Sequence, residues 1–223
     1  MSLFEFPTNA HFGRVLPKSK IYEYAGASSK IKELFVRQVD QVVWKYKLAP
    51  ETINVPATKA VPEIQVFSIT LKTRDLKEDV LRSIDKAIPF PIIYELSFAK
   101  KIKVVTSHKR PSEVDSGKWV VGSYFTTDWV ASTTPRKVLP VTLDLGVLYQ
   151  ELLRSVIPYP ARAKETLHEQ LVRAEAIRSQ EAELEKAKVL LHKEKQFNRK
   201  AEINAKIRTI RKEIDRLTNA KGT

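Results

Sequence analysis

The sequence predicts an α+β fold, in which a mixed β-sheet with packed helices is followed by a long C-terminal helical, coiled-coil-like tail. Two observations carry this prediction. Residues 63–107 combine a strand-like run, an amphipathic helix and two further strand-like runs. From Ala161 to Ala220 the chain contains neither glycine nor proline and is dominated by Ala, Glu, Lys, Arg, Leu and Ile, as long helices are. We therefore expect a globular domain over residues 1–158 and a helical tail over residues 161–220.

The central unit begins with Glu63–Leu71, whose apolar residues point to both faces, as in a strand that is covered on both sides. Asp75 and Glu78 have the spacing of a capping box, and apolar residues then recur at helical spacing as far as Ile88. Pro89 ends this helix, because the residue before a proline avoids the helical conformation.

The next strands are predicted over Ile92–Phe98, Ile102–Thr106 and Trp119–Val130, with a polar loop over His108–Lys118. The first two strands of the unit enclose a helix, so we expect them to pair in parallel through a right-handed crossover. The later strands are joined by short polar loops and should pair antiparallel.

The flanking segments are read in the same way. Glycine and proline punctuate residues 1–27, which indicates an irregular segment. An apolar stripe from Ile31 to Val43 predicts a helix, and residues 52–55 predict a short strand. Thr142 or Asp144 is expected to begin the last helix of the domain, in which Leu145, Leu148, Leu152 and Val156 share a face.

The tail contains a heptad seam, in which large aliphatic residues follow one another at intervals of 4, 3, 4 and 3. Upstream of the seam, the stretch His192–Lys200 is nearly all polar and interrupts the apolar pattern. A bend, a helical hairpin or a change of partner would each explain this interruption. Left in water the seam would be adhesive, so it must pack on the upstream helix, on a second copy of the chain or on another protein. Of these we expect a protein partner or a second copy. The seam consists of Ile203, Ile207, Ile210, Ile214 and Leu217.

Composition bounds the function. The 223 residues carry a net charge of +13, with 23 Lys/Arg against 16 Asp/Glu before residue 161 and 16 against 10 from there on. A basic excess in both parts is typical either of a soluble basic protein or of one that contacts nucleic acid or an acidic partner. Cysteine is absent, no run of 18 apolar residues exists, and the N-terminus lacks the features of a signal peptide. We expect a cytoplasmic protein without a membrane partner.

One basic group stands out in the globular part. A strand edge protected from aggregation and a strip that contacts phosphates are two interpretations of it. The group consists of Lys100, Lys101, Lys103, Lys109 and Arg110.

No catalytic signature is complete. The four histidines lack metal-ligand spacing, the serines lack a nucleophile-elbow context, and the six glycines form no phosphate-binding loop. A metal-dependent nuclease is the alternative, with Asp85 and Glu95 as its acids, but the triplet at Glu95 reads Glu-Leu-Ser and lacks the lysine of such sites. Asp85 is otherwise explained by an ion pair with Lys86 at the helix end. We expect no cofactor, no metal and no catalytic residue.

Six stretches are characteristic when taken together: Leu16–Glu23, Lys32–Val55, Glu63–Leu71, Ile84–Leu96, Tyr124–Trp129 and Lys193–Arg208. With these stretches the chain resembles the prokaryotic domain-of-unknown-function family 4391. The resemblance implies no activity that can be transferred. It does imply a context, because such proteins look like companions of DNA methyltransferases and helicases in restriction-like or phage-defence gene clusters. The expected function is therefore a non-catalytic accessory subunit of a DNA-processing assembly, with a helicase or methyltransferase as partner.

Overall fold

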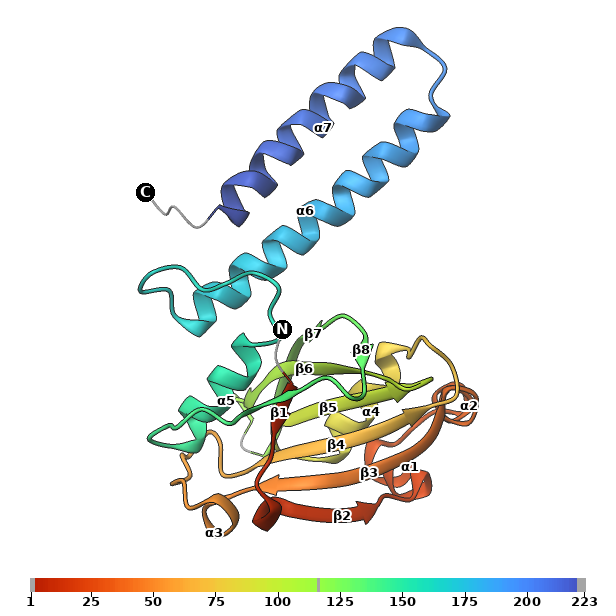
Figure 1. Ribbon diagram of the computed structural model, residues 1–223. Coiled ribbons are helices and arrows are strands. Elements are labelled where there is room, and N and C mark those ends of the chain that lie inside the picture. Colours follow the sequence, from red (N-terminus) through yellow and green to blue (C-terminus); the bar gives the residue numbers. More distant parts are fainter. Residues whose placement is uncertain (1–2, 116, 220–223) are drawn as a thin grey trace. The chain divides into compact units, whose positions relative to one another are not determined.

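The structure is a computed structural model that describes residues 3–115 and 117–219. Its contacts divide the chain into two compact units, Met1–Ile157 and Pro158–Thr223 (Figure 1). The predicted α+β class is confirmed, because the first unit contains a mixed sheet with packed helices and the second contains two long helices.

The main sheet of the first unit has six strands in a continuous order, and the short β8 (Val130–Ala131) pairs with β6. The parallel pairing of β4 with β5 across a helix is confirmed, and so is the antiparallel pairing of the strands that follow. In spatial order the six strands are β2 (His11–Val15), β3 (Val39–Leu48), β4 (Ile64–Leu71), β5 (Ile92–Phe98), β6 (Lys101–Pro111) and β7 (Trp119–Thr126).

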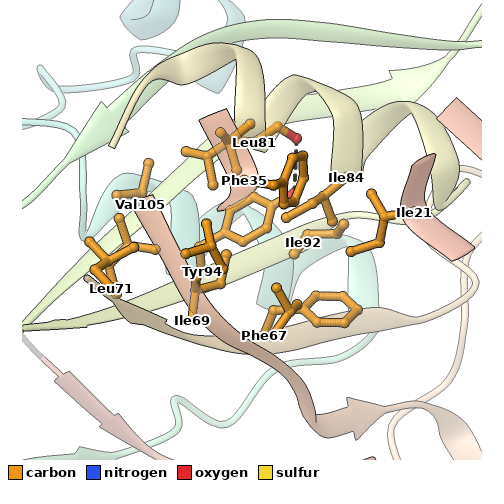
Figure 2. Packing of buried hydrophobic residues seen from close by; sticks show 14 of the residues in the cluster. Ile21, Phe35, Phe67, Ile69, Leu71, Leu81, Ile84, Ile92, Tyr94 and Val105 are labelled. Carbon is orange, nitrogen blue, oxygen red and sulfur yellow. Dashed lines mark hydrogen bonds between the residues drawn. The ribbon is translucent and has the colours of Figure 1, made fainter. Parts of the chain in front are cut away.

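Three helices pack their apolar residues on one face of this sheet. They are α1 (Lys18–Ala25), α2 (Ser29–Gln38) and α4 (Glu78–Ala87). Figure 2 shows their side chains meeting those of the strands in one hydrophobic cluster. Phe35, Phe67 and Tyr94 are fully buried there, so aromatic residues supply much of the apolar area that stabilises the unit.

The opposite face carries different elements. The short strand β1 (Leu3–Glu5) pairs in parallel with β9 (Arg136–Val138), and α5 (Leu145–Arg154) contacts β6. Asp144 caps α5 as predicted, because its carboxylate accepts a hydrogen bond from the Val147 amide at 2.8 Å. Two single turns, η1 (Thr8–Ala10) and α3 (Pro50–Ile53), complete the unit. The predicted strand over residues 52–55 is wrong, because α3 occupies its first half and Asn54 adopts a left-handed backbone.

The helix predicted over Ile31–Val43 is also wrong in its second half. Helix α2 ends at Gln38 and β3 begins at Val39. The apolar residues at 39, 42 and 43 do fit a helical stripe, but they are β-branched, and pairing with β4 gives the backbone of this segment sheet partners. Propensity and long-range pairing together override the helical spacing.

The predicted capping box of α4 does not form. The helix begins at Glu78, and the Lys77 amide donates instead to the side-chain oxygen of Gln38 at 2.9 Å. A residue from the end of α2 therefore accepts from the N-cap amide, which is the role that Glu78 was expected to have. The loop predicted over His108–Lys118 begins later than expected, because β6 continues to Pro111.

The second unit is a helical hairpin of α6 (Leu167–Lys193) and α7 (Phe197–Thr218), which run antiparallel and contact each other (Figure 1). The chain reverses without glycine. Glu194 adopts an extended backbone, and its carboxylate accepts hydrogen bonds from the amides of Lys195 and Gln196 at 2.8 and 2.9 Å. This side chain satisfies the amide groups that a turn would otherwise leave open.

A short segment before α6 binds the C-terminal end of α7. The Arg162 guanidinium donates to the carbonyl oxygens of Arg216, Leu217 and Asn219, at 3.0, 2.9 and 3.2 Å. These carbonyls lie at the C-terminus of α7, where the helix has no intrahelical donors left and carries partial negative charge. Arg173 holds Glu165 in a buried ion pair beside it. No helix of the described residues is long and apolar enough to cross a membrane.

Candidate functional site: a buried carboxylate beside a basic pocket

A buried carboxylate lies at the C-terminal end of α4. Asp85 is 3% exposed. One of its oxygens accepts from the Lys109 ammonium at 3.0 Å, and the other accepts from the phenols of Tyr94, at 2.9 Å, and Tyr124. Three donors from three different strands therefore satisfy this carboxylate, as a buried charge requires.

Lys109 is fully enclosed, with 0% of its side chain exposed. Besides the Asp85 carboxylate, its ammonium donates to the backbone carbonyls of Asp85, at 2.6 Å, and Ile88. All three ammonium protons thus have acceptors, two of which are carbonyls at the end of α4. Lys109 therefore neutralises the Asp85 carboxylate and also caps the C-terminal end of α4.

An irregularity in β6 aims Lys109 inward. The register between β6 and β7 shifts between Ser107 and Lys109. Gly122 stands opposite, where a Cβ would come within 3.3 Å of the His108 carbonyl oxygen, so a side chain there would crowd the bulged backbone. Tyr149 of α5 fixes the same place, because its hydroxyl donates to the Ser107 carbonyl at 2.6 Å and accepts from the Lys109 amide at 2.9 Å.

Burial sets the protonation of this network. Desolvation lowers the pKa of Lys109, and the charge of Asp85 opposes that effect. Desolvation also raises the pKa of Tyr94, Tyr124 and Tyr149, and the Asp85 carboxylate adds to the increase. The phenols are therefore kept as hydrogen-bond donors well above neutral pH.

A pocket of about 560 Å³ opens next to Asp85. Three cationic side chains and an indole ring contribute to its walls. The described residues that line it are Arg82, Asp85, Lys86, Pro89, Gly117, Lys118, Trp119 and Val121.

A second buried carboxylate lies on the opposite face of the sheet. Glu95 is 2% exposed and binds Lys45 at 3.2 Å and the Arg136 guanidinium. The same Arg136 nitrogen donates to the Phe4 carbonyl at 2.8 Å, so the ion pair also ties β1 and β9 to the sheet. Tyr94 and Glu95 are neighbours in β5, and side chains alternate between faces, which places Asp85 and Glu95 on opposite sides.

This arrangement does not favour the nuclease alternative. A metal site needs its acids on one side of the sheet, whereas Asp85 and Glu95 are separated by it, and each is engaged by basic side chains. In the part of the chain that the structure describes, no three His, Asp or Glu side chains come close enough to hold a metal ion. The proposed Asp85–Lys86 pair is replaced by Asp85–Lys109, because Lys109 reaches the carboxylate from inside the domain.

The basic group of the sequence analysis is dispersed. Lys109 is buried and cannot contact phosphates, which corrects its assignment to a nucleic-acid-binding strip. Lys103 lies with its ammonium 4.8 Å from the centre of the Trp129 ring, and Arg110 pairs with Glu113 at 2.9 Å. Lys100, in the turn before β6, and Lys101, the first residue of β6, are exposed.

The heptad seam is used within the hairpin. Ile207 and Ile210 are buried, and Ile203, Ile214 and Leu217 are partly buried, along the helix that packs on α6. The expectation that the seam is free to bind a partner is therefore not what the structure shows. The hairpin, which the sequence left open beside a bend or a change of partner, gives the seam a partner within the chain.

Sequence reasoning missed most of the residues that hold these sites. Tyr94, Tyr124 and Tyr149 satisfy Asp85 or its lysine, and Arg136 and Lys45 satisfy Glu95. No local signal was present, because Lys109 lies between His108 and Arg110 in a polar run that the sequence predicts as a loop. The partner itself lies 24 residues away and has no local signature.

Comparison with known families agrees with the resemblance found in the sequence. Residues 4–214 match the family described as Domain of unknown function (DUF4391). No curated protein and no solved structure matches the chain.

Proposed function

Because the chain belongs to this family of domains of unknown function, we propose its role from its surfaces: a non-catalytic interaction subunit of a DNA-processing assembly. One observation carries the proposal. The tip of the hairpin, residues 186–200, exposes Val189, Leu190 and Phe197 among six Lys/Arg and a single Glu.

The exposed apolar residues of the tip contrast with the rest of the hairpin. The aliphatic residues of the seam are covered by packing of α7 on α6, whereas Phe197 is 83% exposed and Leu190 is 59% exposed. Apolar groups that are rimmed by charge mark interaction surfaces, and aromatic residues dominate the energetics of such surfaces. Each apolar anchor contributes roughly 1.5–3 kcal/mol when a partner buries it.

Charge indicates the kind of partner. Six basic residues against one acid give the tip a net charge of +5, so its complement is an apolar patch with an acidic rim. We assign that patch to a protein subunit, in keeping with the helicase or methyltransferase companions that the resemblance implies. Restriction-like or phage-defence systems are the setting in which such a subunit would act.

The buried acids support a non-catalytic role. Asp85 is held by a lysine and two phenols, and Glu95 by a lysine and an arginine. Carboxylates that are saturated in this way hold the fold together and have little freedom to bind a metal or to move protons.

Co-purification of the tagged full chain from its native cell tests the proposal. The tip variant is Leu190→Glu with Phe197→Glu. The control is Val172→Glu, an apolar site on α6 away from the tip whose exposure is similar to that of Leu190. We expect the tip variant to lose a stoichiometric partner that the wild type and the control retain. Circular dichroism should show unchanged helix content in both variants.

Two further measurements make the result decisive. The partner is purified separately, and its complex with the wild type is weighed by light scattering after nuclease treatment. If nuclease releases the partner, the tip contacts nucleic acid and the proposed protein docking is wrong. If the tip variant forms the same complex as the wild type, the tip is not the interface.

A further inference from the structure

We propose that the pocket beside Asp85 binds a nucleoside phosphate, either as a free nucleotide or as the phosphorylated end of a nucleic-acid strand. The proposal concerns the first unit of the chain and is independent of the hairpin. Its basis is the combination of cationic side chains and a flat aromatic ring around one cavity of about 560 Å³, a size typical of small-molecule sites.

The charge of the lining selects an anion. Arg82, Lys86 and Lys118 line the pocket, and among the described lining residues Asp85 is the one carboxylate. That carboxylate is already saturated, and Lys109 directly behind it compensates its charge. Once the acids that pair with Arg82 and Lys118 are counted as well, these groups keep a net charge of +1, which would attract a phosphate group.

Two of the three cations are preoriented. Arg82 pairs with Glu78 at 2.6 Å, and its guanidinium lies 5.4 Å from the centre of the Tyr124 ring. Lys118 pairs with Asp115 at 2.5 Å. Neither Glu78 nor Asp115 belongs to the lining, so these acids hold the cations from outside the cavity. A guanidinium that is fixed in this way suits the bidentate binding of phosphate.

The aromatic wall selects a planar group. Trp119 and Val121 come from the start of β7, opposite the end of α4, which supplies Lys86, and Pro89 follows just beyond the helix. An indole beside basic side chains is the combination that binds nucleobases, since the ring stacks on the base while the cations bind the phosphate. An inorganic anion would contact the cationic side chains but would not stack on the indole ring.

Isothermal titration of the full chain tests the proposal with two probes. The first is ADP, with adenosine as its phosphate-free control. The second is a single-stranded DNA hexamer with a 5′-phosphate, with the 5′-hydroxyl hexamer as its control. Saturable binding of ADP alone identifies a free nucleotide as the ligand; preference for the 5′-phosphorylated hexamer identifies a strand end. If neither phosphorylated probe binds saturably, or each binds no better than its control, the proposal is overturned.

Substitutions locate the binding. Lys86→Glu should weaken the affinity roughly tenfold, as expected when a charge-assisted contact is lost. Lys30→Glu, the same change at an exposed lysine of α2, should leave the affinity unchanged. Trp119→Ala should weaken binding, and Trp119→Phe should restore most of it because the planar face returns. Equal losses for Lys86→Glu and Lys30→Glu, with an unchanged melting temperature, would show unspecific attraction and overturn the assignment.

Discussion

Replacing Lys109 by methionine removes an ammonium group from the interior while preserving the length of the side chain. The change leaves the Asp85 carboxylate buried and without its cation, and it leaves two backbone carbonyls at the end of α4 without a donor. Only the phenols of Tyr94 and Tyr124 would remain on the carboxylate.

The expected loss can be worked from these contacts. Breaking a buried ion pair by removing one partner costs about 3–5 kcal/mol, because the other charge stays buried. For a unit of this size each kcal/mol lowers the melting temperature by roughly 2–4 °C, which predicts a decrease on the order of 10 °C.

Urea denaturation followed by tryptophan fluorescence measures the loss. Trp44, Trp119 and Trp129 all belong to the first unit, so the signal reports its unfolding alone. Lys101→Met, a change at an exposed lysine on the same strand, should alter the free energy of unfolding by less than about 0.5 kcal/mol.

A double variant identifies the cause. Asp85→Asn combined with Lys109→Met removes both charges, so we expect it to be more stable than Lys109→Met by at least about 1.5 kcal/mol. The reasoning is refuted if Lys109→Met costs less than about 1 kcal/mol, or if the double variant is as unstable as the single one.

Three other predictions concern the hairpin, the buried phenols and the segment before α6. Arg162→Ala should expose the last carbonyls of α7 and speed amide hydrogen exchange there about tenfold or more, while exchange in the first unit stays the same. Above about pH 10 the unfolded chain loses phenolic protons that Tyr94, Tyr124 and Tyr149 keep, so the free energy of unfolding should fall with pH. The lowered pKa of Lys109 acts in the opposite direction below its unfolded value of 10.5, and a flat or rising profile from pH 10 to 11 would contradict the dominance of the three phenols. Limited trypsin treatment should cut within residues 158–164 and release a folded N-terminal core; resistance to cleavage together with a single melting transition would place the domain boundary elsewhere.

Local patterns were sufficient for the elements whose cause is local. The parallel β4 and β5 followed from a helix enclosed between two apolar runs, and the cap of α5 followed from Asp144. Local patterns were not sufficient where a residue distant in the sequence determines the local structure. Gln38 takes over the N-terminus of α4, and sheet pairing converts Val39 and its neighbours from helix to strand.

The candidate site was less predictable than the fold for the same reason. The sequence predicted Asp85 as a nuclease acid or a partner of Lys86, and Lys109 as a residue that contacts phosphates. Nothing in the sequence shows that the two side chains meet. Their pairing depends on a bulge in β6 opposite Gly122. The sequence did not decide between a hairpin and its alternatives for a related reason. The chain reverses with the help of the Glu194 carboxylate, whereas a glycine is the usual signal of such a turn.

The pairing of β1 with β9 has a consequence for synthesis on the ribosome. Leu3 is aligned with Arg136, so the first strand waits until more than a hundred further residues have emerged before its partner exists. At roughly 5–20 residues per second this delay lasts on the order of ten seconds. During that time β1 has no partner strand. It is only three residues long and ends in a glutamate, which limits its tendency to pair with other nascent chains. Closing this strand, and with it the Arg136 contact to Phe4, is therefore among the last steps of cotranslational folding of the first unit.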